Sequence, residues 1–529
     1  MDKHGMDTAA PAFPLHARQF ICEPLYAKEP SQPVFTVPPD FNTTFFGKGH
    51  AIHTHPLLPV IHEEEEDCEV VLLGYFLDPY HPDDDERPRL RRILKALKKE
   101  LPLHLLHDLC GRFVLFIRRP SQAVVVSDAC ALRQLHYHAD GSGRTWCFSQ
   151  ANLVSSHLAL EEDPEAQYFR HHASALTAAY WWPGSSSLYR GVHRLLPNHY
   201  LQLEGGTVHR FWPDAGPMTL EYDAALERVQ TLLEGTMAAA LRRAPLALPL
   251  TAGLDSRLLL AAARPFAASL YVYTMAYASM KDDHEDLRVA QALAEAAGVD
   301  WKPLACPQGM DPHFEVQFFL HSVDAHPACG VLAQALYAHF PKDHWCVKGN
   351  VSEVGRCKYY LFGRALPARR ISGALFATLH NMEGSAFAAA HFQEWIDSTL
   401  PLCERIGMVP TDLFHWELVL GSWQASSQLE WDMAMETLSP YNNRLLLETL
   451  LAVPDRYRQG PEWRFHRDLL QRMWPALLSL PFNPDQGRPE QRLKGSLHDL
   501  LRLFSSHYPG FYYPLKRLYR YFVKAPRTF

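Results

Sequence analysis

Hydrophobic positions in the first part of the chain come in short runs separated by turns. Apolar stretches at 70–76, 111–117, 123–128 and 135–138 each have the length of a strand. A charged segment at about 87–100 lies between the first two and has the spacing of a helix. Short apolar runs with turns between them predict stacked antiparallel sheets, that is, a β-sandwich.

Three polar segments of this part are expected at the surface. Residues 1–40 are rich in proline and polar side chains and are expected to wrap loosely over the molecule. The acidic run 63–67 predicts a solvated loop. His50, His53 and His55 lie in a proline-bearing segment, predicted as a loop, with no cysteine or second cluster nearby, which argues against a metal site.

In the second part, apolar runs alternate with helical spacing. Strands are expected just before residue 251 and at 269–275, 302–306 and 345–349, with a helix at 284–297 that Gly298 ends. Alternating strands and helices predict a parallel sheet, whose ligands bind beyond the carboxyl ends of the strands. The fold class is therefore α/β, with an N-terminal β-sandwich domain at 1–215 and a C-terminal parallel-sheet domain at 216–529.

The length and composition of the chain are typical of a multidomain globular protein. A length of 529 residues predicts at least two domains, and 47% apolar with 21% charged residues is typical of a globular protein. The net charge of −7 gives no case for nucleic acid as a partner. No run of about 18 apolar residues predicts a transmembrane helix. Ten scattered cysteines and an N-terminus without a signal sequence favour a cytoplasmic protein with reduced thiols.

The bend at 251–256 carries the most specific chemistry. Thr251, Ala252 and Gly253 are small enough for backbone N–H groups to approach an anion, and the following helix directs its positive end to the same place. Ser256 adds a hydroxyl donor, and Asp255 is suited to carry a divalent cation beside phosphate oxygens. This pattern predicts a nucleoside triphosphate site. The alternative is a tight turn before a buried helix.

The sequence Thr-Ala-Gly-Leu-Asp-Ser at 251–256 resembles the pyrophosphate loop of the ATP pyrophosphatases, whose usual form is Ser-Gly-Gly-x-Asp-Ser. Its surroundings, over about residues 70–485, resemble the asparagine synthetases. The resemblance implies a glutaminase-like domain of the Ntn-hydrolase type at 1–215. It also implies an ATP-binding synthetase domain with helical additions at 216–529, with ATP and Mg²⁺ as cofactors.

The same resemblance implies roles for individual residues. The pyrophosphate contacts would come from Thr251, Ala252, Gly253, Asp255 and Ser256, and the adenosine contacts from Leu250, Met275, Lys348 and Gly349. Asn350 stands where the family has a glutamate near the acyl-adenylate, and Glu353 stands where it has a magnesium-binding aspartate. Arg356 is suited to neutralise phosphate or an acidic substrate. Core packing of Leu250 and Met275, and a surface position for Arg356, are the alternatives.

Two departures from the family change the expected chemistry. Asp2 follows the initiator methionine where the glutaminase has a cysteine, and the internal Cys22 lacks the free amine that acts as base, so the first domain is expected to be non-catalytic. The family lysine is missing near 480–484, and Arg488, Arg492 or Lys494 are its candidate replacements. A basic, aromatic segment at 500–529 favours a packed helix over a surface for anionic membranes or a partner.

These features favour an ATP-dependent amide-forming ligase that adenylates a carboxylate and couples it to an amine. Relatives without the glutaminase cysteine include β-lactam synthetases and lasso-peptide cyclases, so a peptide or small biosynthetic intermediate is the expected substrate. One alternative is ammonia-dependent amidation of a sugar acid or cell-surface precursor. The other is a scaffold protein that retains the fold without catalysis. A partner protein or a homodimer stays open.

Overall fold

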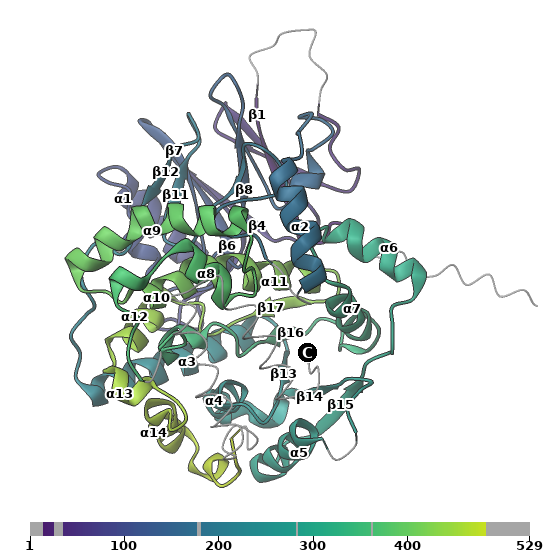
Figure 1. Ribbon diagram of the computed structural model, residues 1–529, viewed down its shortest axis with the longest axis vertical. Coiled ribbons are helices and arrows are strands. Elements are labelled where there is room, and N and C mark those ends of the chain that lie inside the picture. Colours follow the sequence, from purple (N-terminus) through teal and green to yellow (C-terminus); the bar gives the residue numbers. More distant parts are fainter. Residues whose placement is uncertain (1–13, 26–34, 177–180, 282–283, 361–362, 483–529) are drawn as a thin grey trace, which may run out of the picture.

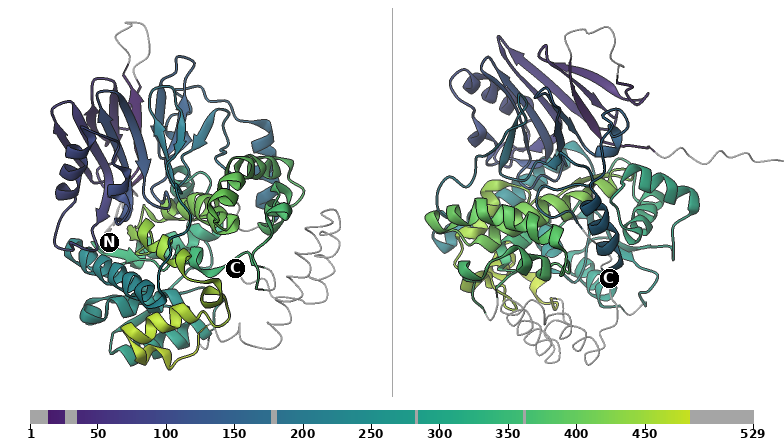
Figure 2. Two further views of the ribbon diagram at one scale, coloured as in Figure 1. Left: turned by 90° about the vertical axis from the view of Figure 1, so that its left-hand side faces the viewer. Right: turned by 45° about the horizontal axis from the view of Figure 1, so that its top comes forward.

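The computed structural model describes residues 14–25, 35–176, 181–281, 284–360 and 363–482. Two antiparallel sheets form the upper part of the molecule in Figure 1, and a parallel sheet surrounded by helices forms the lower part. Figure 2 shows the same two parts from other directions, with the antiparallel sheets layered face to face. The strands at 70–76, 111–117, 123–128 and 135–138 are present, as predicted.

Each antiparallel sheet has six strands. The first has the order β10 (Val192–Arg194), β8 (His136–Ala139), β9 (Thr145–Phe148), β1 (Phe20–Pro24), β3 (His50–Thr54) and β2 (Asn42–Phe46). The second has the order β12 (Val208–Arg210), β11 (His199–Gln202), β7 (Gln122–Ser127), β6 (Cys110–Arg119), β5 (Cys68–Leu77) and β4 (Val60–Glu65).

In the antiparallel part, side chains alternate between the two faces of each strand, so each sheet has one face toward the other sheet and one face away from it. Phe20 of β1 and Val71 and Phe116 of the second sheet share one core between the sheets. The opposite face of the second sheet packs against α1 (Arg87–Leu97) through residues such as Leu90. Strand β5 is buried along its whole length because both of its faces are covered, which explains its continuous apolar sequence.

Three polar segments differ from the prediction. Residues 63–65 belong to the edge strand β4 rather than a loop, because they pair with β5 and α1 supplies cations such as Arg87, 2.6 Å from Glu63. The predicted histidine loop is strand β3. Residues 20–24 of the predicted surface wrap form the buried strand β1, because apolar side chains occupy both of its faces.

The parallel sheet has the order β15 (Trp301–Ala305), β14 (Tyr271–Ala276), β13 (Leu246–Pro249), β16 (Trp345–Val347) and β17 (Glu436–Leu438). All its pairings are parallel, as predicted. The chain leaves β13 toward β14 on one side and later returns to β16 on the other. The carboxyl ends of β13 and β16 therefore flank a topological switch point, where open α/β sheets bind ligands.

Helices cover both faces of the parallel sheet. Leu248 of β13 packs in a cluster with α3, α4, α12 and α14, whereas Ala247 packs on the opposite face with Leu336 of α7. The helices are α2 (Pro164–Leu176), α3 (Tyr222–Arg243), α4 (Leu254–Ala262), α5 (Glu285–Ala297), α6 (Pro312–His321), α7 (Pro327–His339), α8 (Gly373–Leu379), α9 (Ala386–Ile406), α10 (Pro410–Phe414), a π-helix (His415–Gln424), α11 (Ala425–Trp431), α12 (Arg444–Ala452), α13 (Asp455–Arg458) and α14 (Arg464–Met473).

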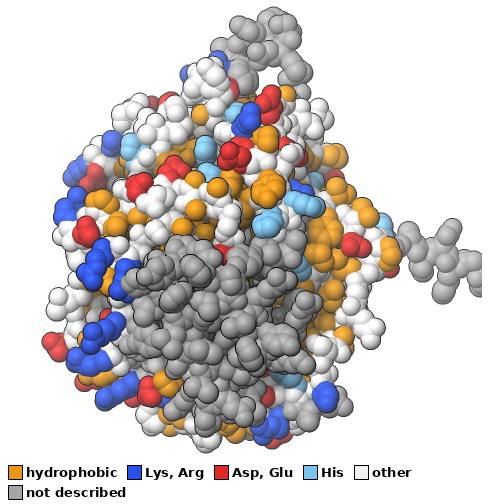
Figure 3. Space-filling model, in the orientation of Figure 1, with side chains coloured by type: hydrophobic (Ala, Val, Ile, Leu, Met, Phe, Trp, Pro, Cys, Tyr) orange, Lys and Arg blue, Asp and Glu red, His pale blue; other side chains and the backbone are white. Residues whose placement is uncertain are grey.

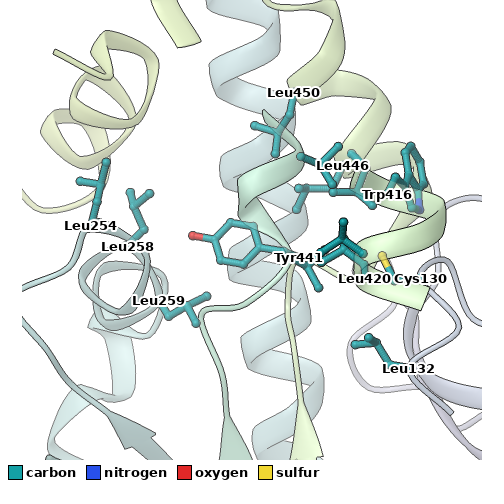
Figure 4. Packing of buried hydrophobic residues seen from close by; sticks show 14 of the residues in the cluster. Cys130, Leu132, Leu254, Leu258, Leu259, Trp416, Leu420, Tyr441, Leu446 and Leu450 are labelled. Carbon is teal, nitrogen blue, oxygen red and sulfur yellow. The ribbon is translucent and has the colours of Figure 1, made fainter. Parts of the chain in front are cut away.

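The apolar face of α4 is held in the core. Figure 4 shows the ring of Tyr441 extending toward Leu254, Leu258 and Leu259 of α4, while Leu450 of α12 lies above it. All five side chains are buried. This packing fixes the start of α4, and with it the bend that precedes the helix.

A buried ionic cluster joins the antiparallel part to the parallel part. Arg112 of β6 donates to Asp432 Oδ2 at 2.8 Å, and Glu436 of β17 pairs with Arg133 at 3.3 Å and with Arg18 at 3.2 Å. Arg112, Arg133, Asp432 and Glu436 are all buried. Residue 215 lies in the connection between β12 and α3, which begins at Tyr222.

The chain is thus a mixed α/β fold with two antiparallel sheets and one parallel five-stranded sheet. Within the described ranges, no helix has both the length and the apolar character needed to cross a membrane. Hydrophobic side chains gather at the right-hand side of the molecule in Figure 3, over α6 and α7, where Val316 and Leu320 of α6 are exposed.

Candidate functional site

The bend at 251–256 follows the carboxyl end of β13, at the switch point. Leu250 extends the strand by donating its N–H to the carbonyl of Tyr273 at 2.7 Å. The segment after β16 lies directly against the bend, because a Cβ atom on Gly349 would lie 2.9 Å from Asp255 Cβ and 3.2 Å from Ser256 N. The structure thus brings together the predicted pyrophosphate loop and the predicted segment 348–353.

Side chains organise the backbone of the bend. Thr251 N–H donates to Ser256 Oγ at 3.2 Å, and Gly253 N–H donates to Thr251 Oγ1 at 3.1 Å. Ala252 N–H donates to Asp286 Oδ1 at 3.0 Å, so a residue of α5 that sequence reasoning missed closes one side of the bend. An acidic residue in the first turn of a helix was the available signal for Asp286.

The first turn of α4 keeps unpaired donors. The N–H groups of residues 254–256 open the helix, and nowhere in the described ranges is a hydrogen-bond acceptor recorded for them. Thr251, Gly253 and Asp255 are half-buried, so the bend is not sealed by the described residues. Free N–H groups at a partly open helix start suit a phosphate or another anion.

Asp255 is already engaged by two side chains. Ser352 Oγ donates to Asp255 Oδ1 at 2.6 Å, and the guanidinium of Arg356 forms an ion pair with the same oxygen. Arg356 also donates to Ser352 Oγ at 2.7 Å, which completes a three-residue cluster. Burial lowers the pKa of Arg356 to about 10, so its guanidinium remains charged at neutral pH. Arg356 is thus half-buried and paired with Asp255, which differs from the free surface position considered for it.

The contacts of Asp255 affect the magnesium site that was predicted at Asp255 and Glu353. The carboxylate of Asp255 does not fit a divalent cation in this arrangement, because a guanidinium already compensates its charge. Glu353 lies in the turn Ser352–Arg356, and its Oε2 is buried without a hydrogen-bond partner in the described structure. Magnesium at this pair stays a prediction that requires Arg356 to move.

The predicted adenosine residues lie apart. Leu250 is completely buried in the cluster that contains α4. Met275 of β14 packs instead against the cluster on the α7 face of the sheet. The structure therefore does not bring these two side chains together, and Leu250 has the surroundings of a core residue.

Lys348 and Asn350 line a cavity of about 240 Å³ beside the bend. It lies between α7, the end of the π-helix, α11 and residues 181–182. Lys348 Nζ lies 3.3 Å from the ring centre of Trp431, and Asn350 Nδ2 donates to Gln424 Oε1 at 2.7 Å. The rest of the lining includes Trp181, Trp182, Trp423, Ser426, Ser427 and Glu430.

Glu430 is a strongly perturbed acid in the wall of this cavity. Its side chain is buried, and its Oε2 has no hydrogen-bond partner in the described structure. Burial raises the pKa of Glu430 to about 7, although Cys329 and Lys348 oppose the shift. Burial also lowers the pKa of Lys348. A buried acid and base with opposed shifts in one cavity indicate a functional site. In the sequence, a glutamate between the apolar residues Leu429 and Trp431 was the signal that could have identified Glu430.

Two other groups of histidines and acids already have partners within the protein. His53 uses both ring nitrogens, at 2.9 Å from Glu23 Oε1 and from Thr43 Oγ1. His62, Glu64 and Glu69 bring three ligand atoms within 4.8 Å of one another in the described part of the chain. Glu69, however, is already paired with His62 at 2.8 Å and with Arg118 at 2.7 Å, so it is not a free ligand.

Cys22 lies inside the first antiparallel sheet. It is completely buried in β1, opposite Cys147 of β9, and burial raises the pKa of its thiol. Cleavage before Cys22 would cut a central strand, so this residue is not positioned to become an N-terminal nucleophile. Asp2, Arg488, Arg492, Lys494 and the segment 500–529 lie outside the described residues.

Comparisons with known proteins add little. No protein-family model and no curated protein match the chain. Among solved structures, it is similar to the glutamine phosphoribosylpyrophosphate amidotransferase of B. subtilis in complex with ADP and GMP. The identity is 12%, the match covers 49% of this chain and 52% of that chain, and the TM-score is 0.19. The chain thus spans about half the length of that enzyme, and so low a TM-score carries no argument about function.

Proposed function

We propose that this protein is an ATP-dependent ligase that adenylates a carboxylate and joins it to an amine. The observation that carries the proposal is the contact between the bend at 251–256 and Gly349 at the switch point of the parallel sheet. Two strand ends meet there around the N–H groups that open α4, which have no acceptor among the described residues. This is the place where open α/β sheets bind nucleotides, and the bend has the small residues that an approaching phosphate needs.

The chemistry has two steps. A carboxylate oxygen of the substrate attacks the α-phosphorus of ATP, and the bond from that phosphorus to the pyrophosphate oxygen breaks. The amine nitrogen then attacks the acyl carbon and loses a proton, and AMP leaves. ATP enters as its magnesium complex. The N–H groups of residues 254–256 and the guanidinium of Arg356 would stabilise the charge of the departing pyrophosphate.

We also propose that the antiparallel part is a glutaminase-like sandwich of the Ntn-hydrolase type that no longer hydrolyses glutamine. The support is the pair of packed antiparallel sheets and the burial of Cys22 within one of them. Nitrogen would then come from an amine of the substrate, or from free ammonia.

Calorimetry with Mg-ATP tests the proposal, followed by AMP release with candidate carboxylates, with and without ammonia. The wild type is expected to bind Mg-ATP. Asp255→Asn is expected to bind it about tenfold or more weakly, because the variant releases the guanidinium of Arg356 from its place beside the bend, and one charge-assisted hydrogen bond from that group is worth about 1.5–3 kcal/mol. Asp397→Asn, on the exposed face of α9, is the control and is expected to bind normally.

Two features favour a second candidate, a scaffold without catalysis. The guanidinium of Arg356 occupies the carboxylate that a catalytic metal would use, and Asn350 replaces an acid. If the wild type produces no heat with Mg-ATP while circular dichroism shows a folded protein, the ligase is rejected and the scaffold is favoured.

A further inference from the structure

The cavity beside the bend has aromatic walls. Trp431 lies at the end of α11, Trp423 lies near the end of the π-helix, and Trp182 lies opposite Asp324. The indole N–H of Trp182 donates to Asp324 Oδ2 at 2.9 Å, so this residue offers the cavity its ring rather than a donor. Trp423 is 39% exposed, whereas Trp182 is buried, so the aromatic surface runs from the protein surface inward.

Among the described residues of the lining, Lys348 is the one lysine or arginine. Lys348 Nζ rests on the ring of Trp431, and within the described residues it has no hydrogen-bond acceptor. An ammonium group removed from water is costly unless an anion or another acceptor meets it. The neighbouring Glu430 is turned instead toward Cys329, with one carboxyl oxygen unpartnered. Lys348 is half-buried and lines the cavity, so an anionic group bound there would meet its ammonium.

Lys348 lies close to the bend at 251–256. Lys348 directly precedes Gly349, the residue whose backbone touches Asp255. An anion held by Lys348 would thus lie at the border between the cavity and the predicted nucleotide site. Flat apolar surfaces fit the remaining space, because tryptophan rings favour stacked or edge contacts with other rings. A small polar acid would leave those rings without contacts.

We propose that the cavity binds an aromatic carboxylic acid, whose ring contacts Trp182 and Trp423 and whose carboxylate pairs with Lys348. The assignment of this acid as the group that is adenylated rests on the function proposed above. The polar end of the acid would then point toward the bend, and the ring would lie away from it.

Fluorescence titration of the full chain with naphthoate, without ATP, tests the site. Saturable binding is expected, and Lys348→Met is expected to weaken it about tenfold, the loss typical of one charge-assisted hydrogen bond. Naphthalenemethanol, which has the ring but no charge, should bind wild type and Lys348→Met equally. Aspartate, which has the carboxylates but no ring, should not compete.

Matched variants separate the cavity from general effects. Lys302→Met is the control, since Lys302 Nζ also lies on an aromatic ring, 4.7 Å from the centre of Tyr271, but outside the cavity. It should bind naphthoate as the wild type does. Trp423→Leu should weaken both naphthoate and naphthalenemethanol. If Lys348→Met does not fold, Lys348→Gln also removes the charge and should weaken naphthoate binding by a similar factor of about ten.

The outcomes are distinct. No saturable naphthoate binding, or equal binding by Lys348→Met and wild type, overturns the proposed site whatever Mg-ATP does. Naphthoate binding that depends on Lys348, in a protein that does not bind Mg-ATP, supports the aromatic-acid site and overturns the ligase. Binding of both ligands supports the two proposals together.

Discussion

Glu430 shows how burial sets the behaviour of one residue. Its carboxyl group lies in the cavity wall with one oxygen unpartnered, and its pKa is raised to about 7 from an ordinary value of 4.5. The folded state therefore favours the protonated form. Because the unfolded chain releases this proton at lower pH, the contribution of Glu430 to stability falls as the pH rises from about 4.5 to about 7.

Glu430→Gln should remove this pH dependence. Between pH 5 and pH 8 the variant is expected to gain stability relative to wild type by up to about 3 kcal/mol, since each pKa unit corresponds to about 1.4 kcal/mol. Urea denaturation across this pH range measures the difference. Glu404→Gln, on the exposed face of α9, is the control for the loss of one carboxylate. A constant difference between Glu430→Gln and wild type would contradict the expectation.

At the scale of elements, the site depends on how closely two strand ends approach. The segment after β16 touches the bend after β13 only because residue 349 has no side chain. Parallel pairing of β13 with β16 places the two strand ends side by side. The packing of α4 against α12 and α14 prevents the bend from moving away from Gly349. A backbone held from both sides cannot adjust freely to an added atom.

Gly349→Ala is therefore expected to displace the bend at 251–256. The new Cβ would lie 2.9 Å from Asp255 Cβ, closer than such atoms approach one another. We expect Mg-ATP affinity in calorimetry to fall about tenfold or more, with an overpacking cost of about 1–3 kcal/mol in stability. Gly309→Ala is the matched control, because a Cβ there meets no atom within 4 Å. Equal ATP binding by the two variants would show that the contact does not matter.

At the scale of the whole molecule, buried charges join the two parts. Arg112 of β6 is held by Asp432, which follows α11, and Glu436 at the start of β17 receives Arg133 and Arg18. Tyr75 of β5 adds a hydrogen bond of 2.7 Å to the carbonyl of Thr437. Such pairs contribute little net stability when intact, but removing one partner leaves a charge buried without compensation.

Arg112→Met is expected to destabilise the protein by about 3–5 kcal/mol, because Asp432 would lose its main partner. Arg87→Met is the control for the loss of one arginine, because its exposed pair with Glu63 is worth about 0–1 kcal/mol. Chemical denaturation monitored by tryptophan fluorescence compares the two. Similar midpoints for both variants would mean that the cluster does not hold the parts together.

Local pattern was enough for part of each sheet and for a few of the helices. The continuous apolar sequence of β5, the alternation of strands and helices after residue 245 and the C-cap at Gly298 are properties of neighbouring residues, and each is present in the structure. The charged strand β4 was missed, because its pairing with β5 outweighs its polar composition. The bend itself was identified from six consecutive residues.

The sequence by itself determined several strands of the antiparallel part, four strands of the parallel sheet, the helix at 285–297 and the position of the bend at 251–256, because hydrophobic periodicity and turn chemistry act over a few residues. Only the tertiary structure decided what surrounds that bend. Arg356 on Asp255, Asp286 on Ala252 and the cavity around Lys348 are contacts between residues far apart in the chain. Such contacts exist only after parallel strands align their ends and helices pack over them, and no local pattern encodes that arrangement.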